Sequence, residues 1–394
     1  MKNIPSAIDS CCVSYCKFLK NRSNYRELPQ SDIEIAIDFS TNDYLNLSKH
    51  PEILQAAYDA GRTYGCGSTG SRLLSGNLDI FEKFEAQIAK DKHTQTSIIF
   101  SSGYQANIAT LSALCDKKIF NEKDVVLFFD KLNHASLYKA VEMSGAKLER
   151  YRHKDISMLN DLLKKYENKK CVKFIVSETV FGMDGDVADV AELASLSKKH
   201  NALLYLDEAH ATGVFGQKGY GLSTSYDLKN IECVIMGTFS KAIGCSGAYV
   251  ACSRNIKNYL VQNCSGLIYS TAPSPMVIGA AQKSWELVKN MDEDRKRLVN
   301  LADYCRKKLQ ECNSKDYSAN IFFDTMNSST NIIPIRVKSS ADALQYKKYL
   351  LQHGILVSAV RTPSVQEPRI RLALSTAHSE ECVDKCIRVL RCFD

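Results

Sequence analysis

The feature that most constrains the fold of this chain is an alternation, between residues 45 and 280 of its 394, of short apolar runs with longer helical patterns. The runs are rich in β-branched residues, and the helical pattern at 190–200 has its apolar residues on one face. Such an alternation predicts an α/β domain with a mostly parallel sheet, and strands that are apolar throughout indicate helices on both faces. The predicted strands are 96–100, 125–129, 172–176, 202–206, 233–237 and 248–252.

We expect three parts: an N-terminal segment (1–44), the α/β domain (45–280) and a smaller α+β domain (281–394) that opens on a charged helix. No apolar run approaches the ~18 residues of a membrane span, and the N-terminus lacks the apolar core of a signal peptide. Fifteen scattered cysteines without a C-x-x-C pair indicate reduced thiols, with neither disulfides nor a zinc site. We therefore expect a cytoplasmic protein. Its net charge of +7 fits an acidic substrate or carrier protein, but an ordinary lysine-rich surface is the more common reason for such a charge.

Two motifs suggest nucleotide chemistry and fail on their context. The string "DEAH" (207–210) names a helicase family, but such an ATPase needs a phosphate loop ending in Gly-Lys, and that dipeptide is absent from the sequence. The string "GCGSTG" (65–70) has the spacing of a dinucleotide-binding loop, yet a helical pattern precedes it where a strand is required. We expect neither an ATPase nor a dinucleotide site, and no nucleic-acid partner.

Polar residues follow five of the predicted strands, where the carboxyl ends of parallel strands place ligands. The clusters begin with Ser101, Asp130, Ser177, Asp207 and Thr238. After the last strand of these, "TFSKAIG" places Lys241 among small residues. Partial desolvation there would lower the pKa of the lysine and make it a Schiff-base amine, although most lysines after strands are solvated.

These residues resemble the α-oxoamine synthases, a family of fold-type I pyridoxal-phosphate enzymes. The similarity runs from about residue 38 to residue 378 and rests on specific motifs. They are "GSTGSRLLSG" (67–76), "SSGYQAN" (101–107), "MDGD" (183–186), "DEAHATGVFG" (207–216), "TFSKAIGCSGA" (238–248) and "LIYSTAPSP" (267–275).

The resemblance implies that Lys241 holds pyridoxal 5′-phosphate covalently. Asp207 would pair with the ring nitrogen and keep the ring an electron sink, and His210 would donate to its phenolic oxygen. His134 would stack on the ring and assist proton transfers. For each histidine the alternative is a purely structural role. The phosphate contacts implied are the helix N-terminus at Gly103 and Tyr104, Thr238 and Ser240, and, from the neighbouring subunit of a homodimer, Ser270 and Thr271.

The resemblance also implies substrate contacts and shows one departure. Arg371 and Asn42 would bind the substrate carboxylate, because a guanidinium matches its two oxygens; Arg369 and Arg361 are the alternatives. Ser364 and Arg22 would contact the acyl donor. The family usually has serine at position 182, where it bonds the phenolic oxygen, whereas this chain has Gly182. One hydrogen bond contributes about 0.5–1.5 kcal/mol, so activity should survive the loss.

We therefore expect a decarboxylative condensation of L-alanine with a pimeloyl thioester of acyl-carrier protein or coenzyme A, as in biotin biosynthesis. Related activities within the family are the alternatives: glycine C-acetyltransferase and 5-aminolevulinate, sphingoid-base or signalling-ketone synthases. A catalytically weak cofactor-binding homologue is a third possibility, against which the presence of Lys241, Asp207 and His210 argues.

Overall fold

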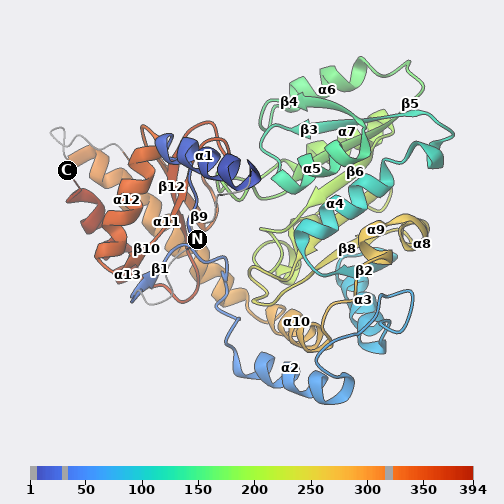
Figure 1. Ribbon diagram of the computed structural model, residues 1–394, viewed down its shortest axis with the longest axis horizontal. Helices are drawn as coiled ribbons and strands as arrows, with labels where there is room; N and C mark the ends of the chain where they lie inside the picture. Colours follow the sequence, from blue (N-terminus) through green and yellow to red (C-terminus); the bar gives the residue numbers. More distant parts are fainter. Residues whose placement is uncertain (1–6, 29–33, 316–322, 394) are drawn as a thin grey trace. The chain divides into compact units, whose positions relative to one another are not determined.

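The computed structural model describes residues 7–28, 34–315 and 323–393, which form two compact units (Figure 1). One unit comprises 42–182 and 186–297; the other comprises residues up to 41, the short stretch 183–185, and 298 onward. The division expected from the sequence treats the N-terminal segment as a part of its own, whereas the structure groups it with the C-terminal residues. In the structure β1 (Ile37–Asp38) pairs in parallel with β10 (Ile355–Leu356), which explains why the N-terminal residues belong with the C-terminal ones.

The larger unit is built on a seven-stranded sheet in the order β2-β8-β7-β6-β5-β3-β4. Only β8 runs against its neighbours; β2 therefore has the same direction as β7. The α/β prediction is confirmed, and all six predicted strands are present. The strands are β2 (Thr96–Phe100), β3 (Asp124–Asp130), β4 (Lys147–Tyr151), β5 (Cys171–Glu178), β6 (Leu203–Asp207), β7 (Cys233–Thr238) and β8 (Ala248–Cys252).

Both faces of this sheet are buried, as the continuous apolar runs predicted. On β3, Leu127 and Phe129 pack into one core cluster with residues of α4 and α5, while Phe128 packs into the other with residues of α6 and α7. Strand β4 was not predicted, because "KLERY" at the edge of the sheet is only partly buried and lacks an apolar run. The helices of this unit are α2 (Pro51–Tyr64), α3 (Asp79–Asp91), α4 (Gly103–Leu114), α5 (Ala135–Ser144), α6 (Ile156–Lys164), α7 (Val190–His200), α8 (Arg254–Asn263), α9 (Ser265–Ile268) and α10 (Pro275–Val288), with short 3₁₀ turns at 117–120, 217–219 and 222–225.

The smaller unit has an antiparallel sheet in the order β11-β12-β9 beside the β1–β10 pair. The mostly apolar run "ILVSAV" (355–360) is divided between β10 and β11, which belong to different sheets. The remaining elements are α1 (Ala7–Asn21), α12 (Ser340–Gln352), α13 (Glu380–Arg391), β9 (Ile332–Arg336), β11 (Ser358–Val360) and β12 (Arg369–Ala373). The predicted charged helix is α11 (Asp292–Lys315), within which the boundary between the units falls.

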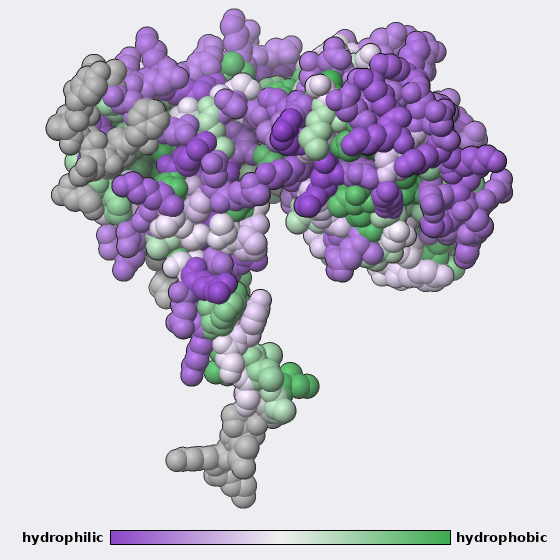
Figure 2. Space-filling view, turned by 90° about the horizontal axis from the view of Figure 1, so that it is seen from above, coloured by the Kyte–Doolittle hydropathy of each residue, from purple (hydrophilic) through white to green (hydrophobic). Residues whose placement is uncertain are grey.

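The surface shown in Figure 2 is mainly hydrophilic, with apolar residues in small groups. Within the described residues, no helix is both long enough and apolar enough to cross a lipid bilayer.

Candidate active site

The predicted cofactor residues of the larger unit lie at the carboxyl edge of its sheet. Strand β6 ends at Asp207, and the register of the sheet places Glu178 of β5 and Met236 of β7 on either side of it. Lys241 follows the end of β7 by three residues and is partly buried. The charges of Asp207 and Lys241 both act on the pKa of His134, so the three groups share one electrostatic environment.

Asp207 is a buried carboxylate whose oxygens are both engaged. Its side chain is 3% exposed; Oδ1 accepts from the backbone N–H of Ala209 (2.9 Å) and Oδ2 accepts from Nδ2 of Asn107 (2.7 Å). A carboxylate can accept about four hydrogen bonds. Asp207 is thus held in one orientation and keeps the capacity to receive the proton on a pyridine nitrogen.

His134 is the N-cap of α5, and its ring is held by its Nδ1 edge. Nδ1 lies 3.2 Å from the backbone nitrogen of Ser136 and 2.7 Å from Oγ of the same residue. Desolvation lowers its pKa; Lys241 lowers it further and Asp207 opposes both. The ring is therefore neutral near pH 7, while solvent still reaches the side chain, as stacking on a cofactor requires.

His210 is buried, and Tyr44 fixes its ring. The hydroxyl of Tyr44 lies 2.7 Å from Nδ1 of His210 and donates to Oδ1 of Asn42 at 3.1 Å. The opposite edge of the ring faces Gly182: a Cβ at that position would stand 2.0 Å from Nε2 of His210. The change from serine to Gly182 therefore removes more than a hydroxyl, because the imidazole of His210 occupies the space that a side chain at position 182 would need.

A phosphate-sized group would meet backbone amides and hydroxyls beside these residues. Helix α4 begins at Gly103, where Ser102 caps Gln105. The site of a Cβ on Gly103 would lie 3.5 Å from Oγ1 of Thr238, which in turn bonds Oγ of Ser240 at 2.8 Å. Tyr104 opens the same helix and its side chain is 53% exposed. This donor set fits a phosphate.

Glu178 is a site residue that sequence reasoning missed. Its side chain is 5% exposed beside Asp207 in the sheet register. Burial and the charge of Asp207 raise its pKa to about 8, against the opposing effect of Lys241. Glu178 is therefore mostly protonated near pH 7. The available signal was its position in "SETVFGMDG", the polar cluster that follows the predicted strand 172–176.

The glutamate of "DEAH" has a structural role. Glu208 is fully buried in an ion pair with Lys92, and it also accepts from the backbone nitrogen (2.6 Å) and the hydroxyl (3.0 Å) of Ser223. The amine of Lys92 bonds the carbonyl of Tyr220 at 2.7 Å. These contacts anchor the loop after β6 and leave Glu208 no part in nucleotide chemistry.

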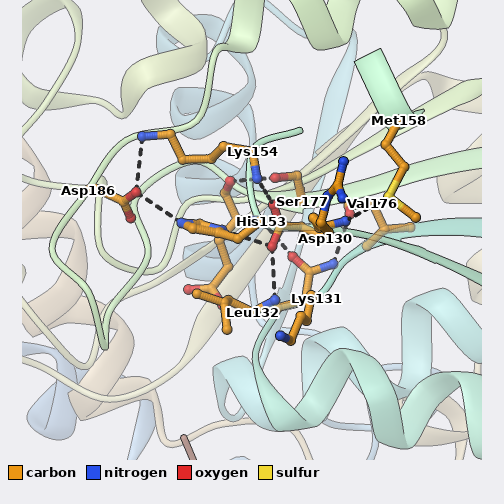
Figure 3. A network of polar contacts seen from close by, with 12 residues as sticks. Asp130, Lys131, Leu132, His153, Lys154, Met158, Val176, Ser177 and Asp186 are labelled. Atoms are coloured by element: carbon orange, nitrogen blue, oxygen red, sulfur yellow. Dashed lines mark hydrogen bonds and ion pairs between the residues drawn. The ribbon is translucent and has the colours of Figure 1, made fainter. Parts of the chain in front are cut away.

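A second unpredicted network surrounds His153 (Figure 3). Its Nδ1 bonds Oδ1 of Asp130 at the end of β3, and its Nε2 bonds Oδ2 of Asp186, each at 2.9 Å. Burial alone would lower the pKa of His153, but hydrogen bonds and charges from both carboxylates raise it to about 9. Lys154 adds a second cation, 3.0 Å from Asp186. The network ties the loop that leads to His134 to the loop that contains Gly182.

Ser270 and Thr271 lie in a loop next to the glycine-rich segment "GSTGSRLLSG". Ser71 and Thr271 form an isolated β-bridge, and the backbone nitrogen of Ala272 donates to the carbonyl of Gly70 at 2.9 Å. The glycine-rich segment therefore packs against this loop. The contact of Ser270 and Thr271 with a neighbouring subunit stays a prediction.

The smaller unit holds the remaining predicted residues, and their roles toward substrate stay predictions. Arg371 is buried on β12. Arg369 is committed to a buried ion pair with Asp184, which makes it the weaker choice for a carboxylate. Arg361 donates to the carbonyl of Tyr25 at 3.3 Å. The two predicted acyl-donor residues have contacts of their own. The guanidinium of Arg22 lies 4.5 Å from the centroid of the Phe18 ring, and Oγ of Ser364 accepts a hydrogen bond from Arg26 at 3.3 Å.

Comparisons with known proteins identify the family of the chain. Residues 34–390 match the family model for class I and II aminotransferases. The chain is 42% identical over 356 residues to a putative 8-amino-7-oxononanoate synthase of Paramagnetospirillum magneticum, covering 90% of this chain and 87% of the relative. It is 41% identical over 357 residues to the 8-amino-7-oxononanoate synthase of Gluconacetobacter diazotrophicus, again covering 90% and 87%.

Solved structures show the same architecture. The 8-amino-7-oxononanoate synthase of Francisella tularensis superposes with a TM-score of 0.74 at 29% identity, over 92% of this chain and 98% of that one. A serine palmitoyltransferase of Sphingomonas wittichii superposes with a TM-score of 0.84 at 24% identity, over 99% and 97%, which shows the shared fold. The predicted fold type and cofactor are confirmed. The chain belongs to the class I and II aminotransferase family and, within it, to the 8-amino-7-oxononanoate synthases, pyridoxal-phosphate-dependent acyltransferases.

Proposed function

We propose that this enzyme condenses L-alanine with a pimeloyl thioester, releasing CO2 and the free carrier and giving 8-amino-7-oxononanoate for biotin biosynthesis. The observation that carries the proposal is the cluster of Lys241, Asp207 and His134 at one edge of the sheet, in a chain whose relatives at 41–42% identity are named for this product. The carrier is coenzyme A or acyl-carrier protein.

The bound cofactor supplies an electron sink that lets the α-carbon of the amino acid lose a proton and later a carboxylate. Asp207, in the orientation set by its two hydrogen bonds, would pair with the ring nitrogen of the cofactor. Lys241 would hold the cofactor, and its amine, once free, would take the proton from the α-carbon of the amino acid. His134 would pack against the cofactor ring, exclude water and offer Nε2–H to the oxygen of the acyl group.

Substrate contacts are assigned to Arg371 and Asn42 for the carboxylate, and to Ser364 and Arg22 for the acyl donor. The hydrogen bond between Tyr44 and Asn42 supports the placement of Asn42 next to the cofactor residue His210. Arg26 joins this group, because it already donates to Ser364.

The active enzyme is proposed to be a homodimer in which Ser270 and Thr271 reach the partner's phosphate site. The preceding residue, Tyr269, is 85% exposed in the single chain, as suits a contact that forms on assembly. A test is to mix the variants Lys241→Ala and Thr271→Ala. Composite sites predict partial recovery of activity in the mixture, because one site of each hybrid dimer then combines intact residues; no recovery in hybrids verified by mass spectrometry would contradict them.

The activity itself is tested by incubating the cofactor-loaded enzyme with L-alanine, glycine or L-serine as the amino acid and with pimeloyl-CoA, pimeloyl-acyl-carrier protein or acetyl-CoA as the thioester. Mass spectrometry should find 8-amino-7-oxononanoate with alanine, at a rate well above that of the other pairs. Faster turnover of glycine with acetyl-CoA would show that the enzyme has a different activity of the same family. Absence of turnover with every pair, despite a bound cofactor, would identify a catalytically weak homologue.

A further inference from the structure

A continuous chain of hydrogen bonds joins Asp207 to His134. From Asp207 it passes to Nδ2 of Asn107 (2.7 Å), which also donates to Oγ of Ser136 (2.9 Å). Ser136 then bonds Nδ1 of His134 at 2.7 Å. Asn107 and Ser136 are buried, with exposures of 1% and 0%. Asn107 lies on α4, which follows β2, and Ser136 lies on α5, which follows β3. Because Asp207 ends β6, the hydrogen bonds connect residues that follow or end three different strands.

The protons in this chain can be assigned by counting donors. The amide of Asn107 has two N–H donors, and both are used on acceptors; its Oδ1 accepts from the hydroxyl of Tyr205 at 3.0 Å. The backbone nitrogen of Ser136 can only donate, so Nδ1 of His134 has no proton. The hydroxyl of Ser136 therefore also donates to Nδ1, and the neutral ring has its proton on Nε2.

We infer that Asn107 is a positioning residue of the reaction: it orients the carboxylate of Asp207 and, through Ser136, fixes His134 in the tautomer that presents Nε2–H to the substrate. The inference rests on the proposed function for the roles of Asp207 and His134, and adds the coupling between them. A leucine at position 107 would have a similar volume but would leave the hydroxyl of Ser136 free to rotate and one oxygen of Asp207 without its donor.

The lowered pKa of His134 agrees with this arrangement. Two donors directed at Nδ1 stabilise the neutral ring and oppose a proton at that atom. Removing one such hydrogen bond should increase the protonated fraction about two- to tenfold at a given pH, as expected for about 0.5–1.5 kcal/mol.

The test uses the full-length apoprotein with ¹⁵N-labelled histidine, so that NMR reports the tautomer and the pKa of His134; turnover of the cofactor-loaded wild type is measured separately with the substrate pairs named above. The variants are Asn107→Leu, Ser136→Ala and the double variant. The matched control is Thr110→Val on the same helix, because the hydroxyl of Thr110 is buried and has no hydrogen-bond partner among the described residues. Titration with pyridoxal 5′-phosphate provides a second readout.

Both single variants should raise the pKa of His134 and increase the share of the Nδ1–H tautomer, the double variant should add little to either, and Thr110→Val should match the wild type. Asn107→Leu should also weaken cofactor binding more than Ser136→Ala does, since only it removes a bond to Asp207. An unchanged tautomer in folded Ser136→Ala protein, or fully additive effects, would overturn the coupling. If the variants show the coupling but the wild-type enzyme turns over no substrate pair, only the proposed function is contradicted.

Discussion

The imidazole of His153 donates to Asp186 through Nε2 at 2.9 Å while its other nitrogen bonds Asp130, so both ring nitrogens are donors and the ring is an imidazolium. Its pKa of about 9 lies above the value of about 6.5 for an unfolded histidine. The folded protein therefore holds a proton that the unfolded chain releases. Its stabilisation is complete below pH 6.5 and is lost as the pH rises through 9.

We predict that His153→Gln lowers the free energy of unfolding by about 3 kcal/mol at pH 6, the equivalent of the difference between the two pKa values. Urea denaturation at pH 6, 7.5 and 9.5 measures it. The gap between variant and wild type should narrow steadily with rising pH. A gap that is constant across this range would show that the proton of His153 contributes nothing to folding.

Glu178 should give a second pH dependence of the same sign. Burial, with the charge of Asp207, raises its pKa to about 8 from 4.5. Below pH 4.5 Glu178 is protonated in both the folded and the unfolded protein, and its contribution to stability is fully present. That contribution is lost as the pH rises through 8, where the buried carboxyl must ionise. Glu178→Gln cannot ionise, so its unfolding free energy should fall less between pH 5 and pH 8.5 than that of the wild type.

The double variant Glu178→Gln/His153→Gln separates the two groups. The loss of stability on raising the pH should be smaller in it than in either single variant, because each substitution removes one titrating group. If Glu178→Gln follows the wild-type curve, Glu178 is ionised in the folded protein and the edge of the sheet has two carboxylates.

The sheet, which the structure confirms, and the candidate cofactor residues were both predicted from local signals. Continuous apolar runs identify buried strands; Asp207 lies directly after one predicted strand and Lys241 shortly after another. Asn107 lies inside a predicted motif without an evident function, since its role depends on partners 29 and 100 residues away in sequence. Ion pairs such as that of Arg369 depend in the same way on which loops the fold brings together.

Gly182 permits the observed position of His210, and the variant Gly182→Ala tests this. A Cβ would stand 2.0 Å from Nε2 and 2.5 Å from two ring carbons of His210, so the imidazole must move away. Forcing atoms into such a packed site typically costs about 1–3 kcal/mol. We predict a loss of this size in the free energy of unfolding and weaker binding of pyridoxal 5′-phosphate in titrations.

Gly67→Ala is the matched control, because among the described residues, its two chain neighbours aside, no atom lies within 4 Å of the Cβ site there. It should leave both quantities unchanged. Gly182→Ser should lose stability like Gly182→Ala but recover part of the cofactor affinity, since its hydroxyl can bond the phenolic oxygen. Equal stability of Gly182→Ala and wild type would mean that His210 relocates without cost.

Lys92→Met should be among the most damaging single changes outside the cofactor residues. It leaves Glu208 buried without its counter-ion, and breaking one side of a buried pair costs about 3–5 kcal/mol. The double variant Lys92→Met/Glu208→Leu removes both charges and should recover most of that loss, because an apolar pair of similar volume fits a buried position. Urea denaturation of the three proteins gives both values.

Lys83→Met, in the exposed pair with Asp79, is the control and should change little. A loss in Lys92→Met no greater than in this control would mean that Glu208 takes up a proton or reaches water, and that the loop after β6 does not depend on the ion pair.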